Sequence, residues 1–154
     1  MSPHCAPIGT VFEVPVGVGA FAYGQVTHYH PDFGNVVAIF AGIRSVRPTD
    51  WVSVLGDIQF MTFFVVKAAA KRKFITILGE CPVPMFLRTF PKFKVPVRDF
   101  RRGEVDHWLL WDGSVTTRMA GLSREQANLP TRTSPSFPLF QDWIREGRTN
   151  AEIL

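Results

Sequence analysis

The side chains best suited to metal chemistry lie close together near position 30. His28 and His30 are two residues apart, and Asp32 follows at the same spacing. Residues two apart in a strand point to one face, about 6–7 Å from each other, so these three side chains could hold a metal ion that activates water. Asp106-His107 is a source of a further ligand. The pattern fits a metal-assisted hydrolase, but it also occurs where two partly exposed histidines end a strand, and we favour that simpler interpretation.

A nucleophilic site has less support. Cys81 with His107 would form a thiol–imidazole pair, but Glu80 precedes the cysteine, and an acidic neighbour raises the pKa of a thiol. The chain contains no G-x-S-x-G elbow, no P-loop and no G-x-G-x-x-G. We therefore expect no cofactor, and the sequence favours a binding protein over an enzyme.

A third group of residues suits binding rather than catalysis. Cations and aromatic rings alternate between positions 88 and 108, and arginine, tryptophan and phenylalanine are enriched at protein interfaces. The formal net charge of the chain is only +4, so a nucleic-acid-binding β-barrel ranks behind a protein partner. The candidate partner-binding residues are Arg88, Lys92, Lys94, Arg98, Arg101, Arg102 and Trp108.

The composition is that of an ordinary folded domain. Of 154 residues, 46% are hydrophobic and 19% are charged, which allows a sizeable core. Fourteen phenylalanines favour strands, and 12 glycines with 12 prolines interrupt the chain often. We predict a single domain over residues 1–154 with a loose segment at 1–8. The predicted fold class is mainly β (α+β): an antiparallel meander or small barrel-like sheet with short C-terminal helices.

The first 40 residues are predicted to form a three-stranded meander. Its strands and turns fall at 9–16, 17–19, 20–30, 31–35 and 36–40. Phe12, Val14 and Val16 share one face of the first strand, which should point to the core. Pro15 cannot donate a ladder hydrogen bond, so that end of the strand should lie at an edge or a bulge. Gly24 in the second strand indicates a bulge or a close backbone contact.

The rest of the chain is predicted in shorter pieces. Strands are expected at 58–66, at 74–78 before Gly79, at 108–111 and at 114–119, with Asp112-Gly113 as a two-residue hairpin. Helical turns are expected to begin near 51, 123 and 139, and 67–73 is either a short helix or the charged end of a hairpin. Recurring prolines between 82 and 96 predict an extended loop with edge-strand pieces around 85–87.

Cysteine content and hydropathy predict a cytoplasmic protein. Cys5 and Cys81 are interpreted as free thiols in a reducing compartment, and a bridge between them stays open. The start of the chain lacks the features of a secretory signal, and the most apolar stretch, at 60–70, is too short to span a bilayer. We expect no membrane partner, while an edge strand could pair with a second copy in a homodimer.

Three short motifs mark the N-terminal hairpin and a later hairpin. They are Gly9-Thr10-Val11-Phe12-Glu13-Val14-Pro15, then Phe21-Ala22-Tyr23-Gly24-Gln25-Val26 after Gly19, and Trp108-Leu109-Leu110-Trp111-Asp112-Gly113. From Ile8 to about Leu129 the chain thereby resembles the immunity protein 26 family. Thr10 stands where the family usually has an acidic residue, and Gln25 where it has an arginine. The family label is shared with a small phosphotriesterase-like protein.

This resemblance implies a role in a bacterial toxin–immunity system. Such a protein binds a cognate protein toxin and blocks it by occlusion, without a catalytic step. It is our leading hypothesis, with the metal-assisted phosphotriesterase-like hydrolase second and the nucleic-acid-binding β-barrel third.

Overall fold

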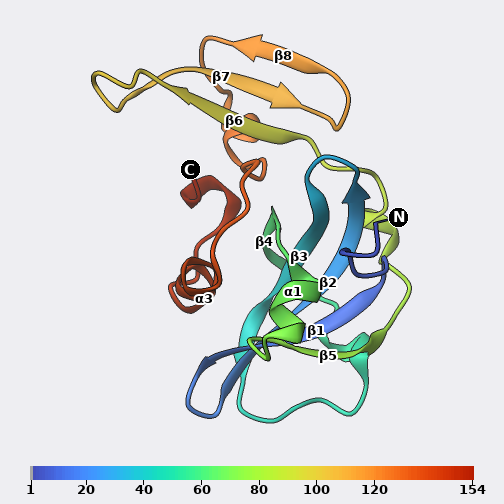
Figure 1. Cartoon of the computed structure of the whole chain (residues 1–154). Coiled ribbons are helices and arrows are strands. Elements are labelled where there is room, and N and C mark those ends of the chain that lie inside the picture. Colours follow the sequence, from blue (N-terminus) through green and yellow to red (C-terminus); the bar gives the residue numbers. More distant parts are fainter. Residues whose placement is uncertain (1) are drawn as a thin grey trace.

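The computed structural model describes residues 2–154, which form two antiparallel sheets (Figure 1). The larger sheet has the strand order β4-β3-β2-β1-β5, and the smaller has the order β6-β7-β8. The prediction of a mainly β fold is therefore confirmed, and the sheets are open rather than closed into a barrel. The strands are β1 (Thr10–Gly17), β2 (Ala20–His30), β3 (Gly34–Arg44), β4 (Ile58–Phe63), β5 (Thr76–Glu80), β6 (Phe93–Arg98), β7 (Val105–Trp111) and β8 (Thr116–Met119).

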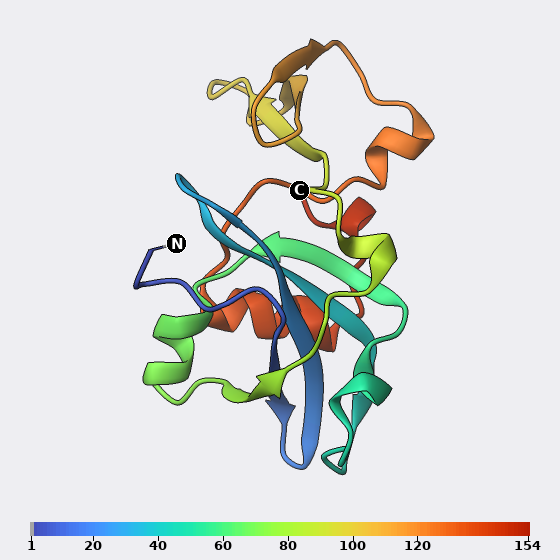
Figure 2. The same cartoon turned by 90° about the vertical axis from the view of Figure 1, so that its right-hand side faces the viewer.

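Short helices connect and cover the sheets. The α-helices are α1 (Val66–Lys71), α2 (Arg124–Ala127) and α3 (Phe137–Arg145), and the 3-10 turns are η1 (Trp51–Val54), η2 (Met85–Leu87) and η3 (Asn150–Glu152). We call β1–β5 with α1 and α3 the body, and β6–β8 the lobe. Figures 1 and 2 both show the lobe at one end of the molecule, set apart from the larger sheet. None of the helices in residues 2–154 is long and apolar enough to cross a bilayer.

The predicted meander is confirmed as β1, β2 and β3, which pair in sequence order. A register shift follows Pro15, and this residue lies beyond the last β1–β5 pair, Glu13 with Thr76, as the missing N–H requires. Gly24 makes the predicted close contact, because a Cβ at this position would lie 2.6 Å from the ring of Phe12. The ring of Phe12 therefore packs directly on the backbone of β2.

Both faces of the body sheet are covered. Phe12, Val14 and Val16 point into the main core, as predicted, where they join Phe140 and Ile144 of α3. The opposite face is also buried: Val11 and Tyr23 pack with Val54 of η1 in a separate cluster. Alternating burial is therefore absent from β1, whose two sets of side chains are both removed from water.

A buried carboxylate ties a loop to this second face. Glu13 is only 4% exposed and accepts hydrogen bonds from Nε and Nη2 of Arg47, at 2.9 and 2.8 Å, and from the Tyr23 hydroxyl at 2.9 Å. The Arg47 guanidinium holds the pKa of Glu13 below its ordinary value of 4.5. Burial, together with the bond to Glu13, raises the pKa of Tyr23 to about 12. The network fastens the loop after β3 over the sheet.

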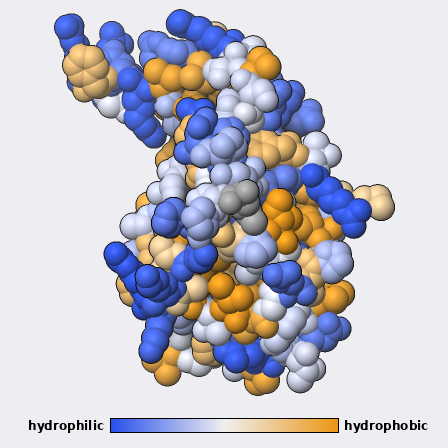
Figure 3. Space-filling model, turned by 45° about the vertical axis from the view of Figure 1, so that its right-hand side comes forward, coloured by the Kyte–Doolittle hydropathy of each residue, from blue (hydrophilic) through white to orange (hydrophobic). Residues whose placement is uncertain are grey.

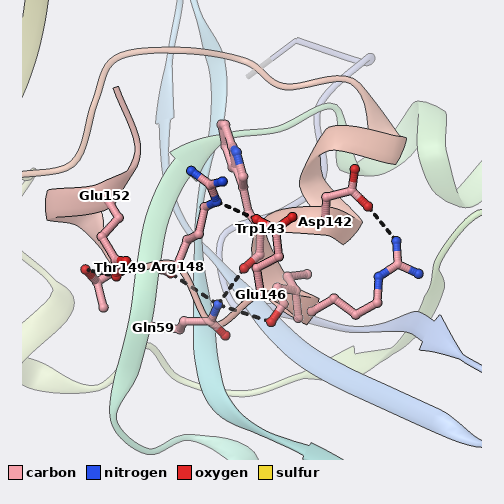
Figure 4. Close-up of polar contacts among 9 residues, drawn as sticks. Gln59, Asp142, Trp143, Glu146, Arg148, Thr149 and Glu152 are labelled. Atoms are coloured by element: carbon pink, nitrogen blue, oxygen red, sulfur yellow. Dashed lines mark hydrogen bonds and ion pairs between the residues drawn. The ribbon is translucent and has the colours of Figure 1, made fainter.

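The C-terminal end of α3 is held by β4 (Figure 4). Nε2 of Gln59 lies within hydrogen-bonding distance of the carbonyl oxygens of Trp143, Ile144 and Arg148, at 3.0, 3.4 and 3.2 Å. The carbonyls of Trp143 and Ile144 also accept hydrogen bonds from the backbone N–H groups of Arg148 and Gly147, at 3.0 and 3.1 Å, so the amide adds a side-chain tie to a helix end whose backbone already closes on itself. The polar cluster in this view is therefore structural.

The lobe begins with a strand that the prolines were expected to prevent. Residues 93–98 form β6, which tolerates Pro96 because it is an edge strand of its sheet, whereas 85–87 forms η2 instead of an edge strand. The Asp112-Gly113 turn is longer than predicted, since β8 begins at Thr116. In the body, Gly79 lies inside β5 rather than after it, and the segment predicted at 67–73 contains α1, which ends at Lys71, rather than a hairpin end.

The predicted loose segment at 1–8 is held in place over the residues that the structure describes. The backbone N–H of Ala6 donates to Oδ1 of Asn35 at 2.8 Å, and Nδ2 of Asn35 donates to the Ala6 carbonyl at 3.0 Å. Ala6 is buried in the main core as a result. The sequence does not reveal this contact of Ala6, because its partner lies on β3, far along the chain; position 1 lies outside the described residues.

Candidate functional site

The two histidines of the predicted metal site bond to segments outside the body sheet: His28 to the chain after η2, and His30 to the β7–β8 turn of the lobe. Nε2 of His28 lies 3.0 Å from the Arg88 carbonyl, and Nε2 of His30 lies 2.9 Å from the Gly113 carbonyl. A carbonyl only accepts, so both rings must carry their proton on Nε2. Each Nδ1 then accepts a hydrogen bond, from the Thr27 hydroxyl at 2.9 Å and from the Asp32 N–H at 3.1 Å.

This arrangement leaves neither imidazole a lone pair for a metal. All four ring nitrogens have partners, and burial lowers the pKa of His28 below 6.5, which favours the neutral ring. Asp32 contributes a backbone N–H to His30, and within residues 2–154 no group of three His, Cys, Asp or Glu side chains is placed to hold a metal. His28 and His30 are therefore held by hydrogen bonds, and over residues 2–154 they are not joined by a third ligand of the kind that the hydrolase hypothesis requires.

The cysteines are both free thiols. Burial raises the pKa of Cys81, and Asp50 adds to the effect. His107 belongs to the lobe and bonds to Asp106, with 2.8 Å between Nδ1 and Oδ2, while Cys81 directly follows β5 of the body. The thiol is thus unactivated, and the predicted pair with His107 is not formed.

Lys94 is not a surface contact. Its side chain is only 1% exposed, and Nζ donates to the carbonyl oxygens of Ala127 and Asn150 at 2.6 and 2.9 Å. Burial lowers the pKa of Lys94. The lysine joins the lobe to η3 and to the end of α2, so it must be removed from the predicted partner-binding set.

The other cations near the start of the lobe are exposed. Arg88 uses Nε to bond the Val83 carbonyl at 2.9 Å, which fixes the chain after η2. Lys92 lines a hollow of about 640 Å³ together with Phe90 and Leu129. Their positive charges face solvent beside Met85 and Phe86, which are 79% and 70% exposed.

The loop between β6 and β7 forms the tip of the lobe. Phe100 is 92% exposed there, between Asp99 and Arg101. Arg98 donates to the Gly103 carbonyl at 3.2 Å, and the carboxylate of Asp99 accepts from the Arg101 N–H at 2.8 Å. Arg102 lies 3.9 Å from the same carboxylate. These contacts hold a solvent-exposed aromatic ring on a constrained loop between arginines.

Both faces of the lobe expose apolar rows near this tip. Pro96, Trp108 and Met119 stand opposite one another across the three strands, so they share one face, and all three are half-buried. Val95 and Leu109, also half-buried, form a row on the opposite face. Trp108 is thus partly exposed, and its predicted role in partner binding stays a prediction.

The base of the lobe is packed on the body by aromatic rings. Trp111 is 5% exposed and lies 6.0 Å from Phe63 and 5.7 Å from Phe93, between ring centroids. Figure 3 shows the lobe as a protrusion whose far end is mostly hydrophilic, with hydrophobic side chains exposed beside it. The base is therefore structural, and the exposed apolar surface lies further out.

Sequence reasoning missed Met85, Phe86 and Met119. It placed 85–87 in an edge strand, where alternate residues would be buried, and in η2 only Leu87 is. For Met119 the signal was available, since pairing from the Asp112-Gly113 turn places it close to Trp108.

No protein-family model, curated protein or solved structure matches this chain. The fold and the surface described above therefore carry the functional argument.

Proposed function

We propose that this protein is the immunity protein of a bacterial toxin–immunity system and neutralises a cognate toxin by covering it. The observation that carries the proposal is the outer part of the lobe, where a constrained loop presents Phe100 between arginines beside two half-buried apolar rows. Aromatic and arginine side chains supply most of the binding energy at protein interfaces. A contact of about 800 Å² per partner is enough to occlude an active site.

The charges of the tip favour a protein partner over nucleic acid. Arg98, Arg101 and Arg102 are interleaved with Asp99 and Glu104, so the loop offers no continuous basic path for a phosphate backbone. Mixed charges around an apolar centre are typical of the polar rim of a protein interface.

We infer that the partner is a toxin from the resemblance of the N-terminal motif to the immunity protein family. The motif residues that can be traced in the fold build the scaffold: Gly9 has φ of +98°, and a Cβ there would lie 2.7 Å from the Cys81 carbonyl oxygen. Such a motif specifies the hairpin. The specificity for one toxin would then depend on the side chains of the lobe.

The proposal is tested by affinity capture followed by calorimetry. When a tagged copy of the protein is expressed in its source cells and purified, one other protein should co-purify with it in a near-equal molar amount. Replacing Arg101 and Arg102 together by Glu should raise the Kd for that protein at least about tenfold, while the melting temperature stays within about 2 °C of wild type.

Arg44→Glu is the control for reversing an exposed arginine outside the lobe. Arg44 is an exposed arginine at the end of β3 whose recorded contact is a bond to the Ser53 carbonyl. The Arg44→Glu variant should bind the captured protein with the same Kd as wild type. Equal affinity of the Arg101/Arg102 double variant and wild type would remove the lobe from the interface.

A further inference from the structure

A second surface, on the body, combines an apolar hollow with an unopposed cluster of cations. The hollow, which we call the α1 groove, has a volume of about 390 Å³ and lies between α1 and the start of α3. Phe64 and Ala69, which are 2% and 4% exposed, form the floor, and Val65 and Phe74 are exposed walls. Its volume lies within the range of ligand pockets.

The walls of the α1 groove are held rigidly by stacked rings. Phe74 stacks on Phe137 with 4.9 Å between centroids and 9° between planes. Beneath them Phe64 stacks on Phe140 of α3 at 4.0 Å and 12°. A groove with fixed walls loses little entropy when a side chain enters it.

The charges around this groove are all positive. Lys67, Lys71, Arg72 and Lys73 lie on or directly after α1, and the chain from 58 to 79 contains no acidic residue. The other wall, 134–138, contains none either. Arg72 lines the groove itself. Such a field attracts anionic groups and repels cationic ones.

Lys73 occupies a backbone position that favours glycine. Its φ is +64°, and within residues 2–154 no other non-glycine residue has a positive φ. The N–H of Lys73 bonds the Ala70 carbonyl at 3.0 Å and that of Phe74 bonds the Ala69 carbonyl at 2.9 Å, so α1 ends in a Schellman motif with lysine at C′. Glycine would be less strained there, and the lysine adds a charge between two groove residues, Arg72 and Phe74.

We propose that the α1 groove binds an acidic peptide segment that inserts a large apolar side chain. The apolar floor and stacked walls receive the side chain, and Arg72 on the groove wall, with Lys71 and Lys73 on either side of it in the chain, receives the carboxylates. Lys67 donates to the Pro3 carbonyl and adds only to the local positive field. A six-residue helix is about 9 Å long, so its cations form a compact patch rather than a track along a polynucleotide. This site is independent of the lobe and of the toxin.

The first test uses a defined peptide. A fluorescein-labelled heptapeptide with a central tryptophan flanked by glutamates should bind in fluorescence anisotropy, and amide NMR shifts should fall at 64–74 and 135–138. Matched peptides, one with alanine at the centre and one with glutamine in the flanks, should bind at least about tenfold more weakly. Equal binding of all three, or shifts confined to other residues, would overturn the proposal.

Two variants separate binding from folding. Lys73→Gly removes one charge and relieves the backbone, so it should raise the melting temperature while weakening peptide binding about fivefold. Ala68→Phe keeps every charge but fills the groove, so it should abolish the preference for tryptophan over alanine. Lys92→Gly removes a lysine elsewhere and should leave peptide binding unchanged.

The lobe variant makes this test independent of the proposed toxin interface. Replacing Arg101 and Arg102 by Glu should not alter peptide affinity. If that change abolishes peptide binding while Lys73→Gly and Ala68→Phe leave it intact, the groove assignment fails, and the lobe proposal does not.

Discussion

The body and the lobe are both antiparallel sheets, but only the body buries both of its faces. Neighbouring residues of β1, such as Val11 and Phe12, are each 0% exposed although they point in opposite directions. In β7 only Trp111 is buried, and Trp108, Leu109 and Leu110 are half-buried. The body is therefore complete as a folded unit, whereas the lobe retains apolar surface that a partner could cover.

The two regions also differ in how they are stabilised. The body has a large main core, while the lobe is attached by the stacked rings at its base, by His30 and by Lys94. Elements with few buried apolar contacts open locally at lower free energy than the core. The comparison therefore associates stability with the core of the body and the proposed toxin contact with the lobe.

The largest effect that separates the regions is expected from removing a ring in the body. Phe140→Ala leaves a cavity beside Phe64 and Phe60 and should lower the free energy of unfolding by about 3–5 kcal/mol. Phe100→Ala in the lobe, which removes an exposed ring, should change it by less than about 0.5 kcal/mol. Urea denaturation measures both free energies of unfolding. Similar losses for the two variants would mean that the body and the lobe do not differ in this way.

A smaller effect is expected at the joint between the regions. Lys94→Met removes the donor for the Ala127 and Asn150 carbonyls and should cost about 2 kcal/mol, because buried acceptors are left without partners. Lys92→Met, two residues away and exposed, is the control and should be neutral in the same denaturation experiment. A neutral Lys94→Met would mean that the lysine does not secure the lobe.

The smallest effect concerns pH. The folded protein resists protonation of His28, because burial lowers its pKa below 6.5, so stability falls as pH drops below 6.5 and levels off below the folded pKa. Glu13, whose pKa is also lowered, weakens the fold only below 4.5. Melting temperatures at about pH 8 and about pH 5.5 should therefore differ for wild type and differ less for His28→Gln. An unchanged pH dependence in the variant would assign the loss to other groups.

The sequence predicted the elements whose signals are local. Alternating Phe12, Val14 and Val16 identified the core face of β1, and the helical turns expected near 51 and 123 are η1 and α2. The errors concern contacts between distant segments. The amine of Lys94 bonds the carbonyls of residues 127 and 150, which lie over it. The imidazoles of the two histidines bond the carbonyls of Arg88 and Gly113. Spacing along a strand shows which side chains share a face, but not what lies opposite them.

Hydrogen exchange on the captured complex tests the central claim most directly. In the free protein, amides of β7 should exchange faster than those of β2, and on complex formation the gain in protection should fall on the β6–β7 loop and β7. Equal protection of β2 and β7 before binding, or a gain confined to the body, would contradict the assignment of binding to the lobe.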